Sequence, residues 1–454
     1  MSFETNKNDG TGYPITILPT EVHSILSSHM LADGFDIVFD LEKSHGSYIY
    51  DSRSKRTLLD FFSFFASGAL GMNHPKLREP SFIEKLGTVA VNKPTNSDAY
   101  TVEMAEFVET FARLAQPSYL PHTFFIDTGT LANENALKTA FDWKVQKNYK
   151  LGYSREVGTQ VIHFRNAFHG RSGYTLSLTN TDPVKINNFP KFSWPRIHNP
   201  IIKFPLTEER LEAVKQEEAL ALRQIKQAIV DHPDDIAALI IEPIQAEGGD
   251  CYFRKEFFIE LRTVCSENDI LFIIDEVQTG VGITGRMWAH EYFVEPDMIT
   301  FGKKMHVCGF VCSKRIDDVA ENVFHVPGRL NSTFGGNLID MVRTAKILEI
   351  IEEEHLVQNA NAVGSHLLEQ LMQLQQEFPA LISNARGLGL FCAIDLDSKN
   401  ERDTLRVKAL EKGLILIGCG EGTIRFRPPL NISIGEIDEG ITIIRSCLKE
   451  MAKG

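Results

Sequence analysis

An aspartate and a lysine each follow an apolar run of the sequence. Asp275 ends the run LFIID, and Lys303 follows MITFG, with a second lysine, Lys304, directly after it. A lysine amine forms an imine with an aldehyde, and a carboxylate beside a pyridine nitrogen favours the protonated ring, so this pair meets two requirements of pyridoxal phosphate chemistry. A structural ion pair is the alternative, and the two residues by themselves favour that alternative.

A candidate phosphate site follows a third apolar run. Gly129 and Thr130 come after FFIDT and stand where a helix would begin. Free backbone N–H groups and the helix dipole at such a point attract a phosphate. An ordinary strand-to-helix turn with a threonine cap explains the same residues, and the GxxxxGK[ST] motif of a P-loop is absent.

The segment AFHGRSG contains two further candidate ligand-binding residues. Phe168 could stack on a flat ring, although core packing is the usual role of a phenylalanine. Arg171 has the fork-shaped donor set that binds a carboxylate, although a solvated arginine is the usual case. Glu242 ends the apolar run AALII. Several polar strand ends converging on one sheet edge would form one ligand site.

The elements that must position these residues alternate between strands and helices. Five apolar runs predict strands, and the periodicity of 131–149 and 255–268 predicts helices. Continuous apolar strands separated by helices predict an α/β fold with a mostly parallel sheet that is covered by helices on both faces. The five runs begin the segments 122–130, 159–170, 236–249, 270–280 and 297–304.

The two ends of the chain have different patterns. Residues 45–60 predict a hairpin, and residues 341–378 predict long amphipathic helix. Shorter apolar segments and a last helix from residue 437 then predict a smaller α+β domain. We therefore expect an N-terminal arm and hairpin packing with the small domain, a large domain and a small C-terminal domain, with bounds 1–60, 61–335 and 336–454.

Charge and cysteine usage exclude several classes of protein. The net charge is −13 with no lysine and arginine run, which disfavours nucleic acid as a partner. Seven cysteines form no CxxC pair, the first residues are polar, and no apolar run reaches about 20 residues. We expect a cytoplasmic protein with reduced thiols, no bound metal and no membrane association. Cys308 and Cys312 are expected as buried core residues rather than as metal ligands.

Six motifs together resemble the class III (ω-amino acid) aminotransferases, which are pyridoxal-phosphate-dependent transferases of fold type I. The motifs occur in the family's order between about residues 40 and 435, and they are FIDTGTLANENALKTA, FHGRSG, IIEPIQAEGG, FIIDEVQTGVGITGRMWAHEYFVEPDMITFGKK, STFGGN and IRFRPPL. The resemblance implies that Lys303 is the Schiff-base lysine, since the family places that residue directly after the glycine. It implies that Asp275 pairs with the pyridine nitrogen.

The same resemblance implies the other cofactor contacts. Gly129 and Thr130 would hold the phosphate, Phe168 would stack on the ring, and Gln278 would donate a hydrogen bond to the ring's phenolic oxygen. Thr333 would reach the phosphate of a neighbouring subunit, which implies a homodimer with shared active sites.

Some departures from the common family pattern resemble the L-lysine 6-aminotransferases. One departure is the segment KKMHVCG, which begins at Lys303, where most members have a glycine-rich stretch after the lysine. The other is GITG at 282–285, where most members carry a GRTG-like element. The resemblance implies transfer of the ε-amino group of L-lysine to 2-oxoglutarate in a ping-pong scheme. The products would be L-glutamate and 2-aminoadipate 6-semialdehyde, which cyclises to a piperideine carboxylate.

Such an enzyme must bind two differently charged substrates. Arg171 would hold the carboxylate that lies far from the ring in both, and Arg425 would hold the near carboxylate of glutamate. Glu247 would neutralise Arg425 when lysine is bound and move away for glutamate, while Glu242 would support the substrate site. Arg427 lies two residues from Arg425, on the same face of a strand, and the resemblance favours Arg425.

Three alternatives stay open. A class III aminotransferase for ornithine, 4-aminobutyrate or acetylornithine is one, and KKMHVCG argues against it. A non-catalytic binding protein of the same fold is another, and intact Lys303, Asp275 and Gln278 argue against it. A mutase or racemase is the third, and the paired arginines fit transamination better.

Overall fold

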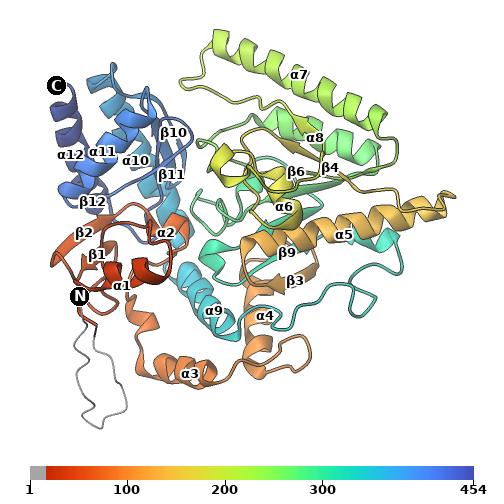
Figure 1. Cartoon of the computed structure of the whole chain (residues 1–454), viewed down its shortest axis with the longest axis horizontal. Helices are drawn as coiled ribbons and strands as arrows, with labels where there is room; N and C mark the ends of the chain where they lie inside the picture. The colour runs from red at the N-terminus through yellow and green to blue at the C-terminus, as the bar shows by residue number, and fades with distance from the viewer. Residues whose placement is uncertain (1–16, 454) are drawn as a thin grey trace.

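A seven-stranded sheet forms the centre of the molecule in the computed structural model, which describes residues 17–453 (Figure 1). The strand order is β3-β9-β8-β7-β6-β4-β5, and β9 is antiparallel to both of its neighbours while the other strand pairs are parallel. The predicted mostly parallel sheet is therefore confirmed. The strands are β3 (His122–Ile126), β4 (Gln160–Phe164), β5 (Arg196–Ile197), β6 (Ile236–Ile241), β7 (Leu271–Asp275), β8 (Met298–Phe301) and β9 (Cys308–Cys312).

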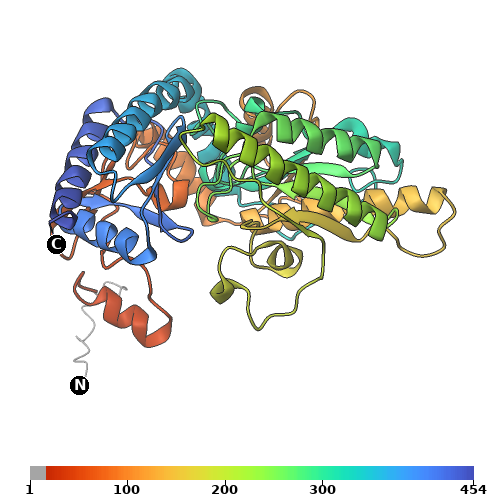
Figure 2. The ribbon, with the colours of Figure 1, turned by 90° about the horizontal axis from the view of Figure 1, so that it is seen from above.

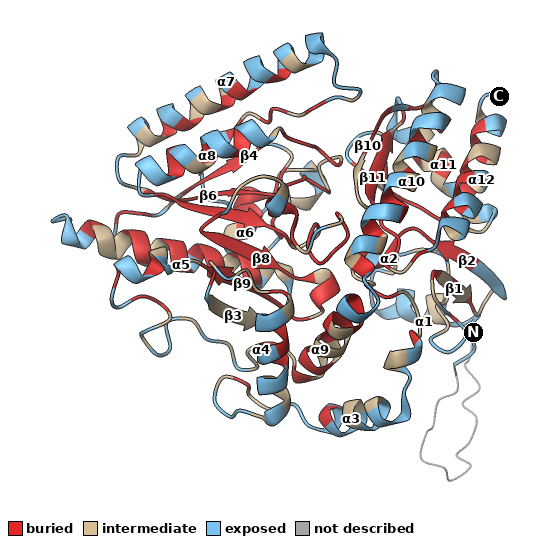
Figure 3. Cartoon of the chain, turned by 180° about the vertical axis from the view of Figure 1, so that it is seen from behind, coloured by how far each residue is buried: buried red, intermediate tan, exposed pale blue. Residues whose placement is uncertain are grey.

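Helices cover both faces of this sheet, as the continuous apolar strands predict. In β6, Leu239 and Ile241 pack in one core with Phe258 of α8, whereas Ile240 packs in a second core with Trp143 of α5. Successive strand residues point to opposite faces, so the two cores lie on the two sides of the sheet. Figure 3 shows helices that are buried along one side and exposed along the other. The helices of this part are α3 (Pro80–Val91), α4 (Val102–Leu114), α5 (Gly129–Lys150), α6 (Gly173–Leu178), α7 (Glu208–Asp231), α8 (Lys255–Glu267) and α9 (Leu338–Glu353).

A second sheet of four antiparallel strands lies beside the first, near the C-terminal helix (Figures 1 and 2). Its strands are β10 (Ser383–Leu388), β11 (Phe391–Asp395), β13 (Ile417–Cys419) and β14 (Thr423–Phe426), in the order β10-β11-β14-β13. Three helices belong to this part: α10 (Leu356–Glu377), α11 (Lys399–Glu411) and α12 (Ile434–Met451).

The predicted hairpin is confirmed and joins the C-terminal part of the chain. Strands β1 (Tyr48–Asp51) and β2 (Arg56–Asp60) pair antiparallel, and β12 (Leu414–Ile415) adds to β2 in parallel. The predicted domain bounds at residues 60 and 335 stay predictions. Residues 1–16 of the expected arm lie outside the described residues, and the described chain begins just before α1 (Val22–His29).

Two details differ from the sequence-based expectation. The segment 341–378 forms two helices, because the chain turns at His355, which has a left-handed φ of 53° between α9 and α10. The apolar run that contains Cys308 and Cys312 forms an additional strand, β9, which was not among the five predicted strands, while both cysteines are buried as expected. None of the helices in residues 17–453 combines the length and apolar character needed to cross a bilayer.

A left-handed turn follows strand β2. The four residues of the short helix α2 (Ser63–Ala66) all have positive φ, between 42° and 69°. L-residues disfavour this conformation. The buried Asp60 accepts hydrogen bonds from the backbone N–H groups of Phe62 and Ser63, both at 2.8 Å, which holds the entry to the turn. The turn leaves the ring of Phe65 half exposed, 5.6 Å from the guanidinium carbon of Arg425.

Candidate active site

The ends of three strands bring the two predicted catalytic residues and a predicted cofactor-binding residue to one edge of the large sheet. Asp275 is the last residue of β7, Lys303 follows β8 after one glycine, and Gly129 begins α5 after β3. Strands β3, β8 and β7 run in the same direction, since β9 is antiparallel to both β3 and β8. Their carboxyl ends therefore share one edge, which is where α/β folds bind ligands.

Four hydrogen-bond donors fix the carboxylate of Asp275. Its Oδ2 accepts from Asn133 Nδ2 at 2.8 Å and from His169 Nδ1 at 2.7 Å. Its Oδ1 accepts from the backbone N–H of Val277 at 3.0 Å and from Thr300 Oγ1 at 3.3 Å. A buried carboxylate held in one orientation is suited to face a protonated ring nitrogen.

Sequence reasoning missed three members of this network. Asn133 lies on α5 one turn after Gly129, His169 is next to Phe168, and Thr300 is on β8. The only available signal was their nearness in sequence to residues that were already candidates. Nothing in the spacing of the sequence could show that all three contact Asp275.

The two adjacent lysines have different environments. Lys303 begins a 3₁₀ turn (Lys303–Met305) with φ of 52° and is partly exposed, whereas Lys304 is 1% exposed. Burial, assisted by the nearby charge of Arg425, lowers the pKa of Lys303 to about 8. The neutral amine that this favours is the form that attacks a carbonyl carbon. Lys304 Nζ is buried and has no hydrogen-bond partner among residues 17–453.

The start of α5 forms an anion cradle. A Cβ at Gly129 would lie 2.7 Å from Val277 Cγ1, so the close approach of helix and loop requires glycine here. Thr128 Oγ1 accepts from the backbone N–H of Leu131 at 3.4 Å and caps the helix. Gly129 and Thr130 are partly exposed at the helix N-terminus, where backbone N–H groups bind phosphate.

Phe168 is positioned by Glu242. The backbone N–H of Phe168 donates to Glu242 Oε1 at 2.9 Å, and the backbone N–H of Ala246 donates to Oε2 at 3.1 Å. Burial raises the pKa of Glu242 to about 7. Both carboxylate oxygens are thus bound to backbone, and Glu242 holds two loops together. These contacts place Glu242 behind Phe168, and the supporting role at the substrate site that is expected of Glu242 stays a prediction.

The two arginines of the last motif have separate partners. Arg427 donates from Nη2 to the buried Asp250 Oδ1 at 2.6 Å, and its guanidinium carbon lies 3.3 Å from the centroid of the Phe391 ring. Arg425 donates from Nη2 to Glu247 Oε2 at 2.7 Å. Arg427 pairs with a fully buried carboxylate, whereas Arg425 pairs with the partly exposed Glu247, which is consistent with Arg425 as the predicted substrate arginine.

Two further predicted residues keep unused donors. Gln278 Oε1 accepts from Arg427 Nε at 3.1 Å and from Arg425 Nη1 at 3.5 Å. The Gln278 amide nitrogen makes no hydrogen bond within the described residues, so it is free for a ring oxygen. Arg171 is exposed, and its guanidinium has no partner in the described part of the chain, which leaves it accessible to a carboxylate.

Thr333 is not brought to this site within one chain. It is exposed, and its carbonyl accepts from Ser97 Oγ at 3.3 Å. No hydrogen bond in residues 17–453 joins Thr333 to Gly129 or Thr130. The role expected for Thr333 needs a second subunit and stays a prediction.

The assembled residues fit pyridoxal phosphate. The anion cradle at Gly129 matches its phosphate, the fixed carboxylate of Asp275 matches its ring nitrogen, and the amine of Lys303 matches its aldehyde. The ring contacts expected of Phe168 and Gln278 stay predictions.

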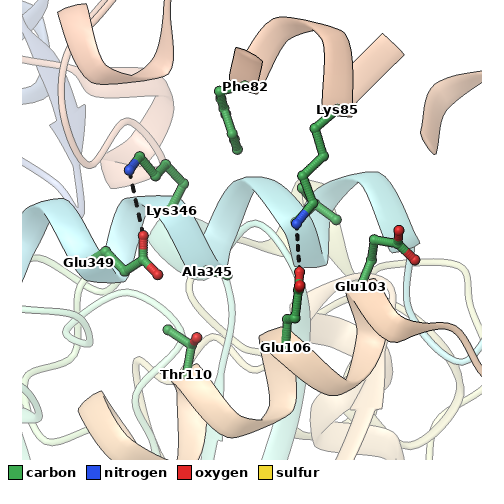
Figure 4. Close-up of a pocket in the computed structure, with 9 residues that line it drawn as sticks. Phe82, Lys85, Glu103, Glu106, Thr110, Ala345, Lys346 and Glu349 are labelled. Carbon is green, nitrogen blue, oxygen red and sulfur yellow. Dashed lines mark hydrogen bonds and ion pairs between the residues drawn. The ribbon is translucent and has the colours of Figure 1, made fainter. Parts of the chain in front are cut away.

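A separate cavity lies between α3, α4 and α9 (Figure 4). Its volume is about 420 Å³, and four of its five charged side chains form ion pairs with one another, Lys85 with Glu106 and Lys346 with Glu349. None of the predicted site residues lines it. The cavity is therefore separate from the catalytic site.

Comparison with known proteins identifies the family of the chain. The family model described as aminotransferase class-III matches residues 31–448. The L-lysine-epsilon aminotransferase of Mycobacterium tuberculosis strain H37Rv is 51% identical over 439 residues, covering 96% of this chain and 97% of that protein. The protein of the same name from Streptomyces clavuligerus is 45% identical and covers 95% of both chains. The solved lysine aminotransferase from M. tuberculosis in the internal aldimine form superposes with a TM-score of 0.93 at 51% identity, covering 96% of this chain and 100% of that chain.

Proposed function

The chain belongs to the class III aminotransferase family, and from that premise we propose that this pyridoxal-phosphate-dependent enzyme moves the ε-amino group of L-lysine to 2-oxoglutarate. The products are L-glutamate and 2-aminoadipate 6-semialdehyde, which cyclises to a piperideine carboxylate. The observation that carries the proposal is the ion pair between the buried Arg425 and Glu247 at the edge of the site.

This ion pair suits a site that must bind two different substrates in turn. Lysine presents its distal amine, so its α-carboxylate lies far from the ring and within reach of a residue such as Arg171. The aliphatic stem of lysine then lies near Arg425, and an uncompensated buried cation there is costly. Glu247 neutralises that cation, since its Oε2 accepts a hydrogen bond from Arg425 Nη2 at 2.7 Å.

2-Oxoglutarate needs the opposite arrangement. The carboxylate next to its keto carbon lies close to the reacting carbon. Arg425 binds this carboxylate after Glu247 moves away. Arg171 holds the distant carboxylate, as it does for lysine. One pocket thus serves both halves of a ping-pong reaction, because one carboxylate side chain changes its partner.

The residues around the ring divide the remaining work. When bound, pyridoxal phosphate withdraws electrons from the amine-bearing carbon of the donor, so that the proton on this carbon becomes acidic. Lys303 Nζ accepts that proton, and the depressed pKa of Lys303, about 8, favours the neutral amine that this step needs. Asp275, held by Asn133 and His169, would pair with the ring nitrogen, and Phe168 would stack on the ring.

We further propose a homodimer with shared active sites. The exposed Thr333 makes no hydrogen bond to the anion cradle of its own chain within the described residues, which supports a role in the site of a neighbouring subunit. The two subunits would then complete each other's phosphate site.

The absorption spectrum of the purified holoenzyme tests the proposed function. We expect a visible band that L-lysine bleaches and that 2-oxoglutarate restores. A band that ignores L-lysine but bleaches with ornithine or 4-aminobutyrate would keep the family and reject the donor. Failure to form any band with added pyridoxal phosphate would favour the non-catalytic alternative.

A further inference from the structure

Lys185 contacts the carboxylate oxygen of Glu247 that Arg425 does not contact. Lys185 ends a 3₁₀ turn (Pro183–Lys185), and its Nζ lies 2.5 Å from Glu247 Oε1. The other oxygen, Glu247 Oε2, accepts from Arg425 Nη2 at 2.7 Å. The carboxylate thus lies between two cations, with one oxygen bound to each.

The three charged side chains differ in burial. Arg425 is 1% exposed, whereas the side chains of Glu247 and Lys185 are 25% and 23% exposed. Lys185 Nζ also lies 5.6 Å from the ring centroid of Phe168. Lys185 therefore stands at the mouth of the site, between the residue that covers the ring and the carboxylate that neutralises Arg425.

The turn that carries Lys185 is held by its own residues. Asp182 Oδ1 accepts from the backbone N–H of Val184 at 3.0 Å and caps the turn. Lys185 belongs to none of the motifs that resemble the family, and its contact with Glu247 joins residues 62 positions apart.

We propose that Lys185 is a specificity-determining residue that retains Glu247 when an incoming carboxylate takes Arg425. The inference rests on the proposed function and deepens it. Releasing Arg425 would otherwise leave Glu247 without a partner in a partly buried position, which is unfavourable for a charged group. With Lys185 present, Glu247 keeps one of its two ion pairs throughout the exchange.

The proposal assigns Lys185 to one class of ligand. Ligands with a carboxylate next to the reacting carbon require Arg425 to exchange partners, so they depend on Lys185. Ligands with only the distant carboxylate leave the contact between Glu247 and Arg425 in place, so they do not. Loss of Lys185 therefore changes the preference between two ligands, not the strength of binding in general.

The test uses the holoenzyme and two unreactive ligands in titration calorimetry. Glutarate has two carboxylates and hexanoate has one. In Lys185→Met we expect the Kd of glutarate to rise about 3- to 5-fold, the upper part of the range expected for a partly exposed ion pair, and the Kd of hexanoate to change less than about 1.5-fold. Lys185→Arg keeps the charge and should restore glutarate binding.

A matched control lies in the same segment. Lys191 Nζ contacts only the backbone carbonyls of Ile186 and Phe189 among the described residues. Lys191→Met should leave both Kd values unchanged. If Lys185→Met lowers the melting temperature, Lys185→Gln provides a second neutral variant with a polar end.

Half-reaction kinetics give an independent result. In Lys185→Met, KM for L-glutamate should rise while KM for L-lysine and both kcat values stay close to wild type. Equal losses for both ligands, no change for either, or tighter glutarate binding would each overturn the assignment. If L-lysine fails to bleach the wild-type band, the proposed function fails, but the comparison of glutarate with hexanoate still decides the role of Lys185.

Discussion

Lys303 and Lys304 are neighbours of the same residue type with opposite access to the site. Lys303 is partly exposed and its pKa is lowered to about 8, mainly by burial. Lys304 is almost fully enclosed, its Nζ has no partner among residues 17–453, and burial lowers its pKa well below the ordinary value of 10.5. Both lysines have a lowered pKa, so the difference between them is that an aldehyde can reach Lys303 and not Lys304.

Single substitutions of the two lysines should have different effects. Lys303→Ala should abolish the visible band with pyridoxal phosphate, whereas Lys304→Met should keep it. Lys304→Met should also raise the free energy of unfolding by about 1 kcal/mol, because it removes a buried donor that lacks a partner. Borohydride reduction followed by peptide mass spectrometry identifies the modified lysine, and label on Lys304 would contradict the assignment.

The gain from Lys304→Met should depend on pH. The folded chain binds the Lys304 proton more weakly than the unfolded chain, so wild-type stability falls as pH drops below 10.5. The stability difference between variant and wild type is then largest near neutral pH and narrows as pH rises toward 10.5. Unfolding at two pH values measures this difference.

Among single residues, the sequence predicts those site residues that directly follow a strand. Lys303, Asp275 and Gly129 each follow an apolar run, and the fold brings them to one edge. The contact of His169 with Asp275 joins residues 106 positions apart, and that of Lys185 with Glu247 joins residues 62 apart. Such contacts depend on how loops lie after folding, which apolar periodicity does not encode.

Among the elements, the break between α9 and α10 shows why a continuous helical pattern misleads. Residues 341–378 keep helical periodicity, yet the chain turns at His355 because the two halves pack on different partners, α9 on α4 and α10 on β10. Within α10, Gly364 lies against the turn between β10 and β11, and a Cβ there would lie 2.0 Å from the Gly389 carbonyl carbon.

Replacing Gly364 should therefore destabilise the protein. Alanine has the higher helix propensity, but the Cβ would push two backbone segments apart, so we expect Gly364→Ala to cost about 2 to 3 kcal/mol. Gly87 of α3 is the matched control, since a Cβ there meets nothing within 4 Å. Gly87→Ala should stabilise by about 0.5 to 1 kcal/mol. Denaturant midpoints compare the two, and equal shifts would contradict the packing argument.

For the whole molecule, the alternation of strands and helices was enough to predict the fold class. The predicted hairpin at 45–60 is also present, but its pairing with β12, more than 350 residues later, had no local signal. The antiparallel strand β9 was not predicted, because its short apolar run follows Lys303 within a few residues and has no helix before it to mark a separate strand. Thr333 is exposed, and the role predicted for it needs a second chain.

Mixed dimers test whether Thr333 serves the neighbouring site. Lys303→Ala should be inactive, and Thr333→Glu should be weak because its carboxylate would repel the phosphate. Random mixing makes about half of the dimers hybrids, each with one intact site, so activity should recover to about a quarter of wild type. If the hybrids form and activity does not recover, Thr333 serves the site of its own chain.

The left-handed turn at Ser63–Ala66 has a backbone that suits D-amino acids better than L-amino acids. Each of its four L-residues holds a torsion that costs about 1 to 2 kcal/mol, and the surrounding chain must offset this strain. For a D-amino acid the same torsions are the relaxed ones. In a chain assembled by chemical ligation, this turn beside Arg425 is a place where mirror-image residues fit the native backbone without strain.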